Sequence, residues 1–344
     1  MTTVGRWSPN KVRARVLDGT WVSTEVPSDV AVSGGSPYVV VYPWSAGFGA
    51  KYADPATLPP GVSRGVAFST NSDAIAVGSD TSQYVTAYPW SAGFGTKYAD
   101  PGTLPTARAR AVTFSPSDSE VAFGIDASPM IMVYAWSAGF GSKFADPAVA
   151  LTVRVNDLDF SPSGNDIVLA YGGIPSVLAY PWSAGFGTKY ADPASLPSND
   201  GNGVKFSRSG TDVAIPHTNT PYIAVYPWSA GFGTKYVQPA TLPTDTGRHA
   251  AWTNSDLAIA HSASPNISVY PWSAGFGTKY TNPATLPAGN GLGVDFTSDE
   301  TAIVVAHAIT PFITAYPWSA GFGTKYADPA TLPTFVGYAT DFTP

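Results

Sequence analysis

Two pairs of aspartates have the residue type and spacing for acid–base chemistry. They are Asp157 with Asp159, and Asp295 with Asp299. One carboxyl group of such a pair can donate a proton while the other accepts one. Aspartates near turns, however, are ordinarily turn formers. The sequence holds only three glutamates and lacks a P-loop, a GxSxG motif and an HExxH motif. It therefore predicts a protein that is not an enzyme.

Three histidines raise the question of a metal site, because they share one repeated position. They are His217, His261 and His307, each eleven residues before a tryptophan. Zinc lies about 2.0 to 2.1 Å from its ligands, whereas packed sheets lie about 10 Å apart. Equivalent positions of successive sheets cannot easily share one ion, so we expect no metal and no cofactor.

A repeated phrase must position these residues. VYPWSAGFGAKYADPATLP, at residues 41–59, returns almost verbatim six more times. The intervals between its tryptophans are 46, 46, 46, 46, 44 and 46 residues. A period of roughly 20 to 50 residues indicates a solenoid, a propeller or an array. The tryptophans are Trp44, Trp90, Trp136, Trp182, Trp228, Trp272 and Trp318.

Each copy contains four short apolar runs separated by turn-forming clusters, which predicts a four-stranded antiparallel meander. In the third run the first position is always β-branched, the next one varies and the one after it is small again. That period of two is typical of a strand. Seven such units favour an all-β fold, a seven-bladed β-propeller of four-stranded antiparallel blades. An open solenoid is the alternative.

The C-terminal end of the chain favours a closed ring. The residue 24 positions after each motif tryptophan falls in the next first strand, and the last such residue is Phe342. We expect the C-terminal strand, residues 337–342, to complete the first blade and to remove an open sheet edge. Trp21, which lies 23 residues before Trp44, is a competing source of that strand.

Residues 1–28 match the repeat poorly and carry Arg6, Lys11, Arg13 and Arg15. We therefore expect two parts, a basic N-terminal arm at 1–28 and the propeller at 29–344.

The composition excludes several classes of protein. With 344 residues, of which 44% are hydrophobic, the chain can bury a large core. A net charge of -6 offers no general attraction to nucleic acid. The absence of cysteine excludes disulfides. We also expect a soluble protein without a cleaved signal or membrane insertion, because neither an apolar signal core nor about 18 consecutive apolar residues occurs.

The segment from Leu158 to Trp182 resembles a WD40 repeat, with FSPSG, then DIVLA, a short turn and VLAYPW. Tyr180 and Pro181 stand where WD40 repeats usually carry Trp-Asp, so the hydrogen-bond network of WD40 blades should be absent. The phrases YPWSAGFGTKY and FSPSG are similar to those of WD40-like proteins encoded by tailed bacteriophages.

That resemblance implies a non-enzymatic binding or assembly module located in the virion, as a tail, fibre or capsid-associated component. Its partners would be other virion proteins, with the arm as a docking segment. One alternative is a module that binds a host glycan or receptor, and another is a glycan-degrading enzyme.

The repeated tryptophans are expected to be packing anchors, the alternative being an exposed aromatic rim for sugars. Residues that differ between copies cluster on the face shared by the blade links and the second-to-third turns. Function is usually carried on such loops, although drift predicts the same variation. The candidate binding residues are Arg64, Arg108, Arg110, Arg154, His217, Arg248, His261 and His307.

Overall fold

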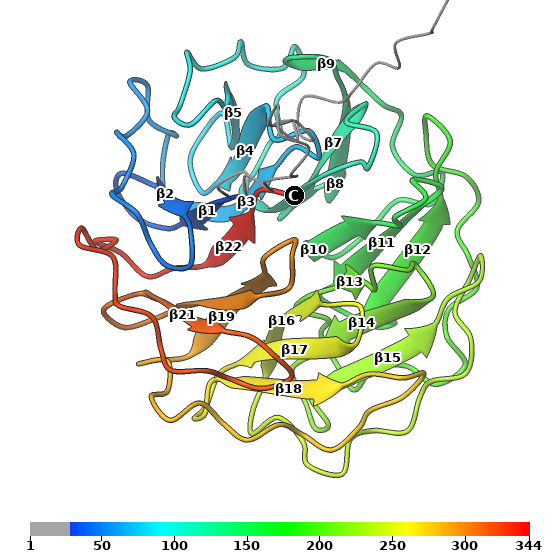
Figure 1. Cartoon of the computed structure of the whole chain (residues 1–344). Helices are drawn as coiled ribbons and strands as arrows, with labels where there is room; N and C mark the ends of the chain where they lie inside the picture. The colour runs from blue at the N-terminus through cyan, green and yellow to red at the C-terminus, as the bar shows by residue number, and fades with distance from the viewer. Residues whose placement is uncertain (1–27) are drawn as a thin grey trace, which may run out of the picture.

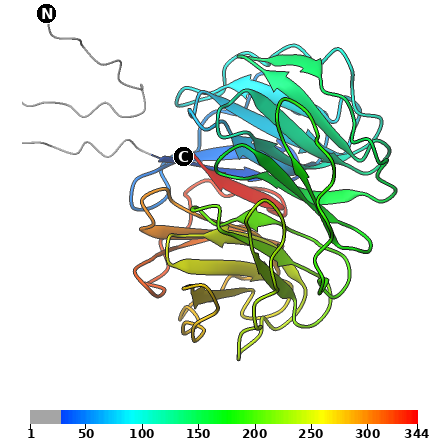
Figure 2. The same ribbon diagram turned by 90° about the vertical axis from the view of Figure 1, so that its right-hand side faces the viewer.

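Short runs rich in β-branched, alanine and aromatic residues form most of the strands in the described part of the chain. A computed structural model describes residues 28–344 as seven antiparallel sheets, with no helix in that range, arranged around one axis (Figure 1). A view turned by 90° shows the sheets stacked face to face (Figure 2). The all-β, seven-bladed propeller is confirmed.

The strands, numbered in chain order, are grouped below by their position within a blade, from the axis outward. The innermost strands are β3 (Ser63–Phe68), β6 (Ala109–Phe114), β10 (Val155–Phe160), β13 (Lys205–Phe206), β16 (Gly247–Trp252), β19 (Gly291–Phe296) and β22 (Ala339–Phe342). The second strands are β1 (Ser28–Ser33), β4 (Ala74–Ser79), β7 (Glu120–Ile125), β11 (Asp166–Tyr171), β14 (Asp212–Pro216), β17 (Asp256–His261) and β20 (Ala302–His307). The third strands are β2 (Val39–Trp44), β5 (Val85–Pro89), β8 (Ile131–Trp136), β12 (Val177–Pro181), β15 (Ile223–Pro227), β18 (Ile267–Pro271) and β21 (Ile313–Pro317).

The C-terminal strand closes the ring. β1 is hydrogen-bonded to β2 on one side and to β22 on the other, with Val30 opposite Phe342. Neighbouring innermost strands then contact one another in a complete circuit, from β22 through β3, β6, β10, β13, β16 and β19 back to β22. The prediction that the C-terminal strand completes the first blade is confirmed. Trp21 and the expected basic arm lie outside the described residues, except that β1 begins at Ser28.

The fourth strand of each blade follows the third strand with few ladder bonds. Only one blade has a regular fourth strand, β9 (Phe140–Lys143). In the other six, a bridge such as that between Trp44 and Phe48 and a single bond such as Tyr52 N to Val41 O, at 3.0 Å, hold the segment. Those six have a proline before the tryptophan, whereas the blade with β9 has Ala135. Proline has no N–H to donate, so the full ladder forms only where it is absent.

The two faces of the ring carry different loops. We call the face of the blade links and the second-to-third turns the link face. The opposite face, which carries the first-to-second turns and the SAGFG hairpins, is called the motif face. In the first hairpin, Ala46 and Gly47 have φ of 50° and 136°. Gly49 instead permits close packing, since a Cβ there would lie 3.1 Å from Pro43. The repeated glycines therefore meet two different requirements.

Six of the seven motif tryptophans are only 4 to 8% exposed, and Trp272 is half-buried. They form no exposed aromatic rim. Each packs edge-on against rings from its own blade and the preceding one, as Trp44 does with Phe48, Tyr326 and Phe342 at centroid distances of 5.1 to 5.4 Å. The tryptophans thus fasten adjacent blades together.

A buried carboxylate reinforces four of these contacts. Asp256, for example, accepts a hydrogen bond from the Tyr280 hydroxyl of its own blade at 2.8 Å and one from Trp318 Nε1 of the next blade at 3.1 Å. Glu120 occupies the same position beside Trp182 but accepts a hydrogen bond from the Ser119 hydroxyl, and the buried Trp182 Nε1 has no partner within residues 28–344. The clasp residues are Asp29, Asp166, Asp212 and Asp256.

Deletion of residues 335–344 should lower the melting temperature by many degrees, because it removes β22 and exposes an edge of β1. Thermal unfolding followed by circular dichroism measures this. Deletion of Pro344 alone is the matched control and should leave the transition in place. An unchanged transition after the longer deletion would show that closure does not depend on β22.

Glu120→Asp should stabilise the protein by about 1 kcal/mol, because the shorter carboxylate can reach the orphaned Trp182 N–H. The reverse change, Asp256→Glu, should destabilise it by a similar amount. Urea unfolding of both variants measures the two free energies. If both changes destabilise, the carboxylate length does not control the clasp.

Candidate active site

A cavity of about 150 Å³ lies on the propeller axis and is lined by residues from all seven innermost strands or from the links that lead into them. Alternate residues of a strand point to the same side, so every second residue of an innermost strand faces the axis. Asp157 and Asp159 of β10 are two such residues, while Leu158 and Phe160 pack into the core. Because side chains alternate in direction along a strand, charged side chains of the innermost strands point to the axis of an otherwise apolar ring.

Bulges near the start of the innermost strands bring a second set of side chains to the cavity. Five of these strands contain a register shift, which leaves one extra residue in each, and a bulge re-aims such a side chain. Four of the five extra residues are polar or charged: Arg64, Arg110, Asn156 and Arg248. All four line the cavity on the side of the link face.

Buried aspartates deeper in the cavity hold neighbouring strands together. Asp159 Oδ2 accepts the Phe206 N–H at 2.9 Å, and Asp295 Oδ2 accepts the Phe342 N–H at the same distance. Asp341 Oδ2 accepts the Phe68 N–H at 2.7 Å. The other oxygen of Asp341 has no hydrogen-bond partner among residues 28–344. This carboxyl group therefore has one oxygen fixed and one free.

Lys205 supplies the positive charge among these acids. Its Nζ lies 3.0 Å from Asp159 Oδ1. Burial lowers the pKa of Lys205, but the carboxylates of Asp159, Asp341 and Asp295 outweigh that effect, and the pKa is raised above its usual value. Although 41% of the side chain remains exposed, it is enclosed by the narrow cavity. Lys205 thus stays cationic through the neutral range.

Two carboxyl groups of the cavity, Asp157 and Asp341, have pKa values raised to near neutrality. Burial raises the pKa of Asp157 to about 7. Burial and the adjacent Asp295 raise the pKa of Asp341 to about 8. The pKa of Asp295 is also raised, chiefly by burial. A carboxyl group with a pKa near the working pH can both give and take a proton.

His249 completes the axial cluster. Its Nε2 lies 3.8 Å from Asp157 Oδ2, and its Nδ1 is 3.1 Å from the Val294 carbonyl. Burial and the Lys205 cation lower the pKa of His249, so the ring is neutral at pH 7. Within residues 28–344, no group of three or more acidic or histidine side chains could hold a metal ion.

The predicted arginines do gather on the link face, and most have carboxylate partners that the sequence analysis missed. Arg64 makes a two-pronged contact with Asp80, at 2.8 and 3.1 Å. Arg110 contacts Asp126 in the same way. Two further arginines are less firmly held: Arg108 Nε lies 2.9 Å from Asp80 and 3.5 Å from Asp126, and Arg154 Nη2 lies 3.5 Å from Asp200.

The predicted histidines do not belong to that surface. His217, His261 and His307 are fully buried inside their blades. Nε2 of His261 lies 3.0 Å from the Ser268 hydroxyl, and that of His307 lies 2.9 Å from the Thr314 hydroxyl. In the blade of His217 the corresponding residue is Ala224, which has no hydroxyl, and neither ring nitrogen of His217 has a hydrogen-bond partner within residues 28–344. These side chains are packing residues, because their strand position points between two sheets.

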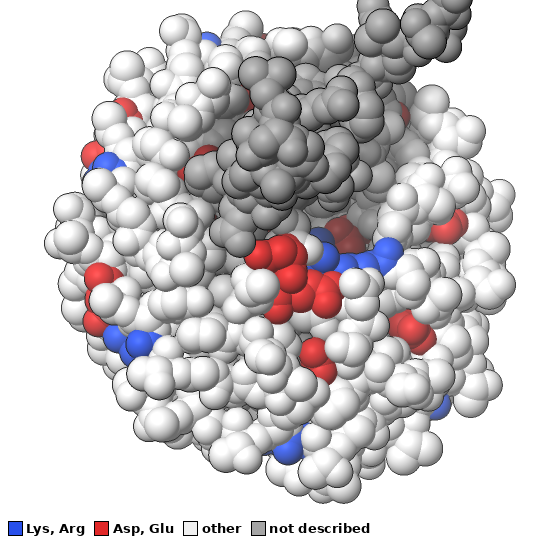
Figure 3. All heavy atoms as spheres, viewed as in Figure 1, with Lys and Arg blue, Asp and Glu red and all other residues white. Residues whose placement is uncertain are grey.

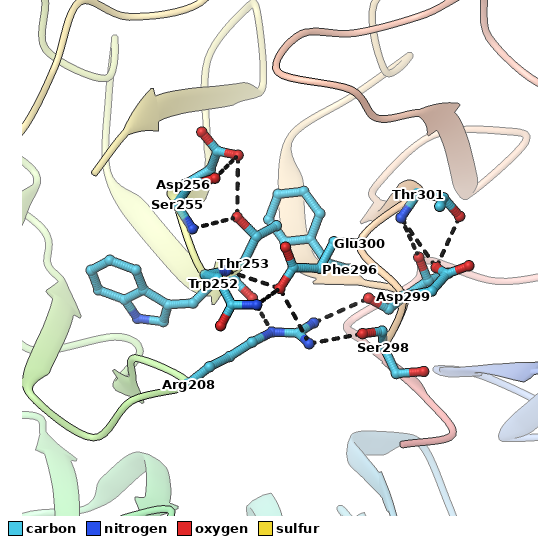
Figure 4. A network of polar contacts seen from close by, with 12 residues as sticks. Arg208, Trp252, Thr253, Ser255, Asp256, Phe296, Ser298, Asp299, Glu300 and Thr301 are labelled. Carbon is cyan, nitrogen blue, oxygen red and sulfur yellow. Dashed lines mark hydrogen bonds and ion pairs between the residues drawn. The ribbon is translucent and has the colours of Figure 1, made fainter. Parts of the chain in front are cut away.

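A separate charged network on the motif face is fully occupied by structural contacts (Figure 4). Arg208 donates to the carbonyls of Trp252, Thr297 and Ser298 at 3.0 to 3.1 Å and so joins three blades. Asp299 accepts hydrogen bonds from Thr301 and is a turn former. Figure 3 shows acidic and basic side chains gathered near the middle of this face, on an otherwise mostly uncharged surface.

Comparison with known proteins supports the fold. No protein-family model and no curated sequence matches the chain. A Bacteroides uniformis structure with the provisional name 6-phosphogluconolactonase has a TM-score of 0.69 and 11% identity, and the match covers 92% of this chain and 99% of that one. The Pseudomonas aeruginosa periplasmic gluconolactonase has a TM-score of 0.69 and 12% identity, with the same coverage.

A third structure, from Bacteroides fragilis and with the provisional name 6-phosphogluconolactonase, has a TM-score of 0.68, 12% identity and coverage of 94% and 99%. At such low identity this likeness shows the fold alone.

The expectation of a non-enzymatic virion module is wrong. The reported neighbours with functional names are lactonases rather than virion components, and the axial acid–base cluster has no counterpart in that expectation. Nothing in the comparisons supports a bacteriophage origin or a virion location, and the expected virion and host partners are untested. The described residues include no helix of the length and apolar character that a membrane span requires.

The two aspartate pairs that the sequence singled out lie only partly in the axial cluster. Asp157, Asp159 and Asp295 belong to the axial cluster, whereas Asp299 does not. Lys205, His249 and Asp341 were missed because they lie far apart in the chain. A signal did exist, since the residue before the last aromatic of each innermost strand varies while the residue before it is apolar in six of the seven strands. That position reads Ala67, Thr113, Asp159, Lys205, Ala251, Asp295 and Asp341.

Acid should destabilise the fold through the buried histidines. Burial lowers the pKa of His217 to about 4, against about 6.5 in the unfolded chain. The unfolded state therefore binds more protons between these values, and stability is lost as the pH falls from 6.5 to 4. For one histidine that loss is at most about 3 kcal/mol.

His217→Ser, which copies Ser33 and Ser79 of other blades, isolates this effect. The variant should lose less stability than the parent between pH 6.5 and 4 in urea unfolding experiments. Parallel losses in the two proteins would show that His217 does not titrate on unfolding.

Proposed function

We propose that this protein is a hydrolase that opens a sugar lactone, or a closely related cyclic ester, in the axial cavity. The observation that carries the proposal is the cluster of Asp341, Asp157 and Lys205 in the axial cavity. Asp341 and Asp157 are carboxyl groups that can exchange protons near neutral pH, and Lys205 is a cation throughout that range. The names of the structural neighbours support the choice of a lactone as substrate.

Asp341 is the proposed general base. Its fixed oxygen accepts the Phe68 N–H, and its free oxygen can accept a proton from a water molecule. The oxygen of that water forms a bond to the lactone carbonyl carbon as the proton moves to Asp341. Because burial raises the pKa of Asp341 to about 8, the base form holds its captured proton firmly enough to act near neutral pH.

Lys205 is the proposed electrostatic stabiliser. A negative charge develops on the carbonyl oxygen when water adds, and a preoriented cation in the partly enclosed cavity stabilises it more than bulk solvent does. When the ring C–O bond breaks, the alkoxide leaving group takes the proton from Asp341. The product is a hydroxy acid, and the carboxyl group of Asp341 returns to its starting state. Asp157, with its pKa near 7, is a second proton carrier in the same cavity.

Hydrolysis of glucono-δ-lactone and 6-phosphoglucono-δ-lactone, followed at constant pH by titration, tests the proposal. The rate above the spontaneous reaction should rise with pH and level off above about 8, as Asp341 loses its proton. Asp341→Asn should reduce kcat by roughly 10²-fold or more, since a positioned base contributes about 10² to 10⁴-fold.

Asp192→Asn is the matched control, because Asp192 lies on the outside of a blade in an ion pair with Lys189. It should keep full activity. Absence of turnover by the parent protein on both lactones, or equal rates for the parent and Asp341→Asn, would overturn the proposed function.

A further inference from the structure

The seven blades offer an internal comparison at the mouth of the axial cavity. In the five bulged innermost strands, the bulge position faces a residue of the second-to-third turn in the same blade. In two blades this pair is an arginine with an aspartate, Arg64 with Asp80 and Arg110 with Asp126. Each of these guanidinium groups is neutralised by two contacts with its carboxylate.

The blade that contains β16 breaks this rule. Its bulge residue is Arg248, but the facing turn residue is Ser262, whose hydroxyl accepts a hydrogen bond from Arg248 Nε at 2.8 Å. Among residues 28–344, Arg248 forms no ion pair. The carboxylate of Asp245 attracts Arg248 electrostatically, but no hydrogen bond joins the two side chains within residues 28–344.

Arg248 is partly buried and lines the cavity beside His249. Burial lowers the pKa of its guanidinium, and the attraction of Asp245 does not compensate. An unneutralised cation costs free energy in a partly enclosed site. Replacement of the partner carboxylate by a serine therefore leaves a charge that a bound anion can balance, with the Nη groups as unused donors.

We propose that Arg248 is the specificity-determining residue of the axial cavity, and that the cavity binds substrates carrying an oxyanion, either a phosphate or a carboxylate group. Arg64 and Arg110 cannot do this equally well, because each is already held by an aspartate. The inference rests on the proposed function in that it defines the substrate class of the same site.

Isothermal titration calorimetry with inorganic phosphate and with gluconate tests it. Arg248→Gln should weaken binding of the preferred anion at least about tenfold, the loss expected for one charge-assisted hydrogen bond. Ser262→Asp keeps Arg248 but recreates the pair seen between Arg64 and Asp80, and it should weaken binding to a similar degree. The probe that binds more tightly to the parent protein identifies the oxyanion as phosphate or carboxylate.

Ser91→Asp adds the same negative charge on an exposed hairpin of the motif face and is the control. It should change binding less than twofold. The inference is overturned if the parent protein binds neither probe, or if Arg248→Gln and Ser262→Asp both bind like the parent.

Turnover of glucono-δ-lactone and of 6-phosphoglucono-δ-lactone separates this inference from the proposed function. Anion binding that depends on Arg248, with turnover of neither lactone, would sustain the binding site and reject the hydrolase. Turnover with anion binding that ignores Arg248 would reject the binding site and sustain the hydrolase.

Discussion

The contact between neighbouring blades is the interaction on which the rest of this structure depends. A three-stranded or four-stranded sheet whose two faces are both apolar cannot exist alone in water, and here every sheet is covered on both sides by its neighbours. The motif tryptophans and the carboxylates of the clasp residues join the outer parts of adjacent blades. Axial carboxylates such as Asp159 and Asp295 bind the backbone of adjacent innermost strands in a similar way. Polar contacts between adjacent blades therefore stabilise the ring both near its outer rim and next to its axis.

This construction gives the axial aspartates two roles. Each uses one oxygen to accept a backbone N–H, which keeps the carboxyl group in a fixed place. Their enclosure, together with the crowding of several acids, makes ionisation unfavourable and raises the pKa values of Asp157 and Asp341 toward the neutral range. Lys205 opposes that trend and prevents a cavity with only negative charge. A position that strengthens the ring thus also produces groups able to transfer protons.

The near-identity of the seven copies makes their differences informative. Packing residues such as the motif tryptophans recur because each blade presents the same surface to its neighbour. The residues that face the axis are free of that requirement, since a side chain there meets the cavity rather than a sheet. Charged residues accumulate at these positions in only some of the blades, so a symmetric scaffold carries an asymmetric site. The substitution of a serine for the aspartate opposite Arg248 is one such difference.

The sequence by itself determined the number of blades and the strand order within them, because period and alternation are local properties of the chain. The register of Phe342 favoured closure by the C-terminal strand over a closing strand at Trp21, and the tertiary structure decided between them. It also located the arginines on the link face. It did not reveal the axial cluster. Successive members of the set Asp157, Lys205, His249 and Asp341 are separated by 44 to 92 residues along the chain, and only closure of the ring brings them around one cavity. Sequence likewise could not distinguish Asp295, which faces the axis, from Asp299, which forms a turn, or place the three histidines inside the blades. Burial and charge compensation are properties of the assembled ring, and the tertiary structure alone decided them.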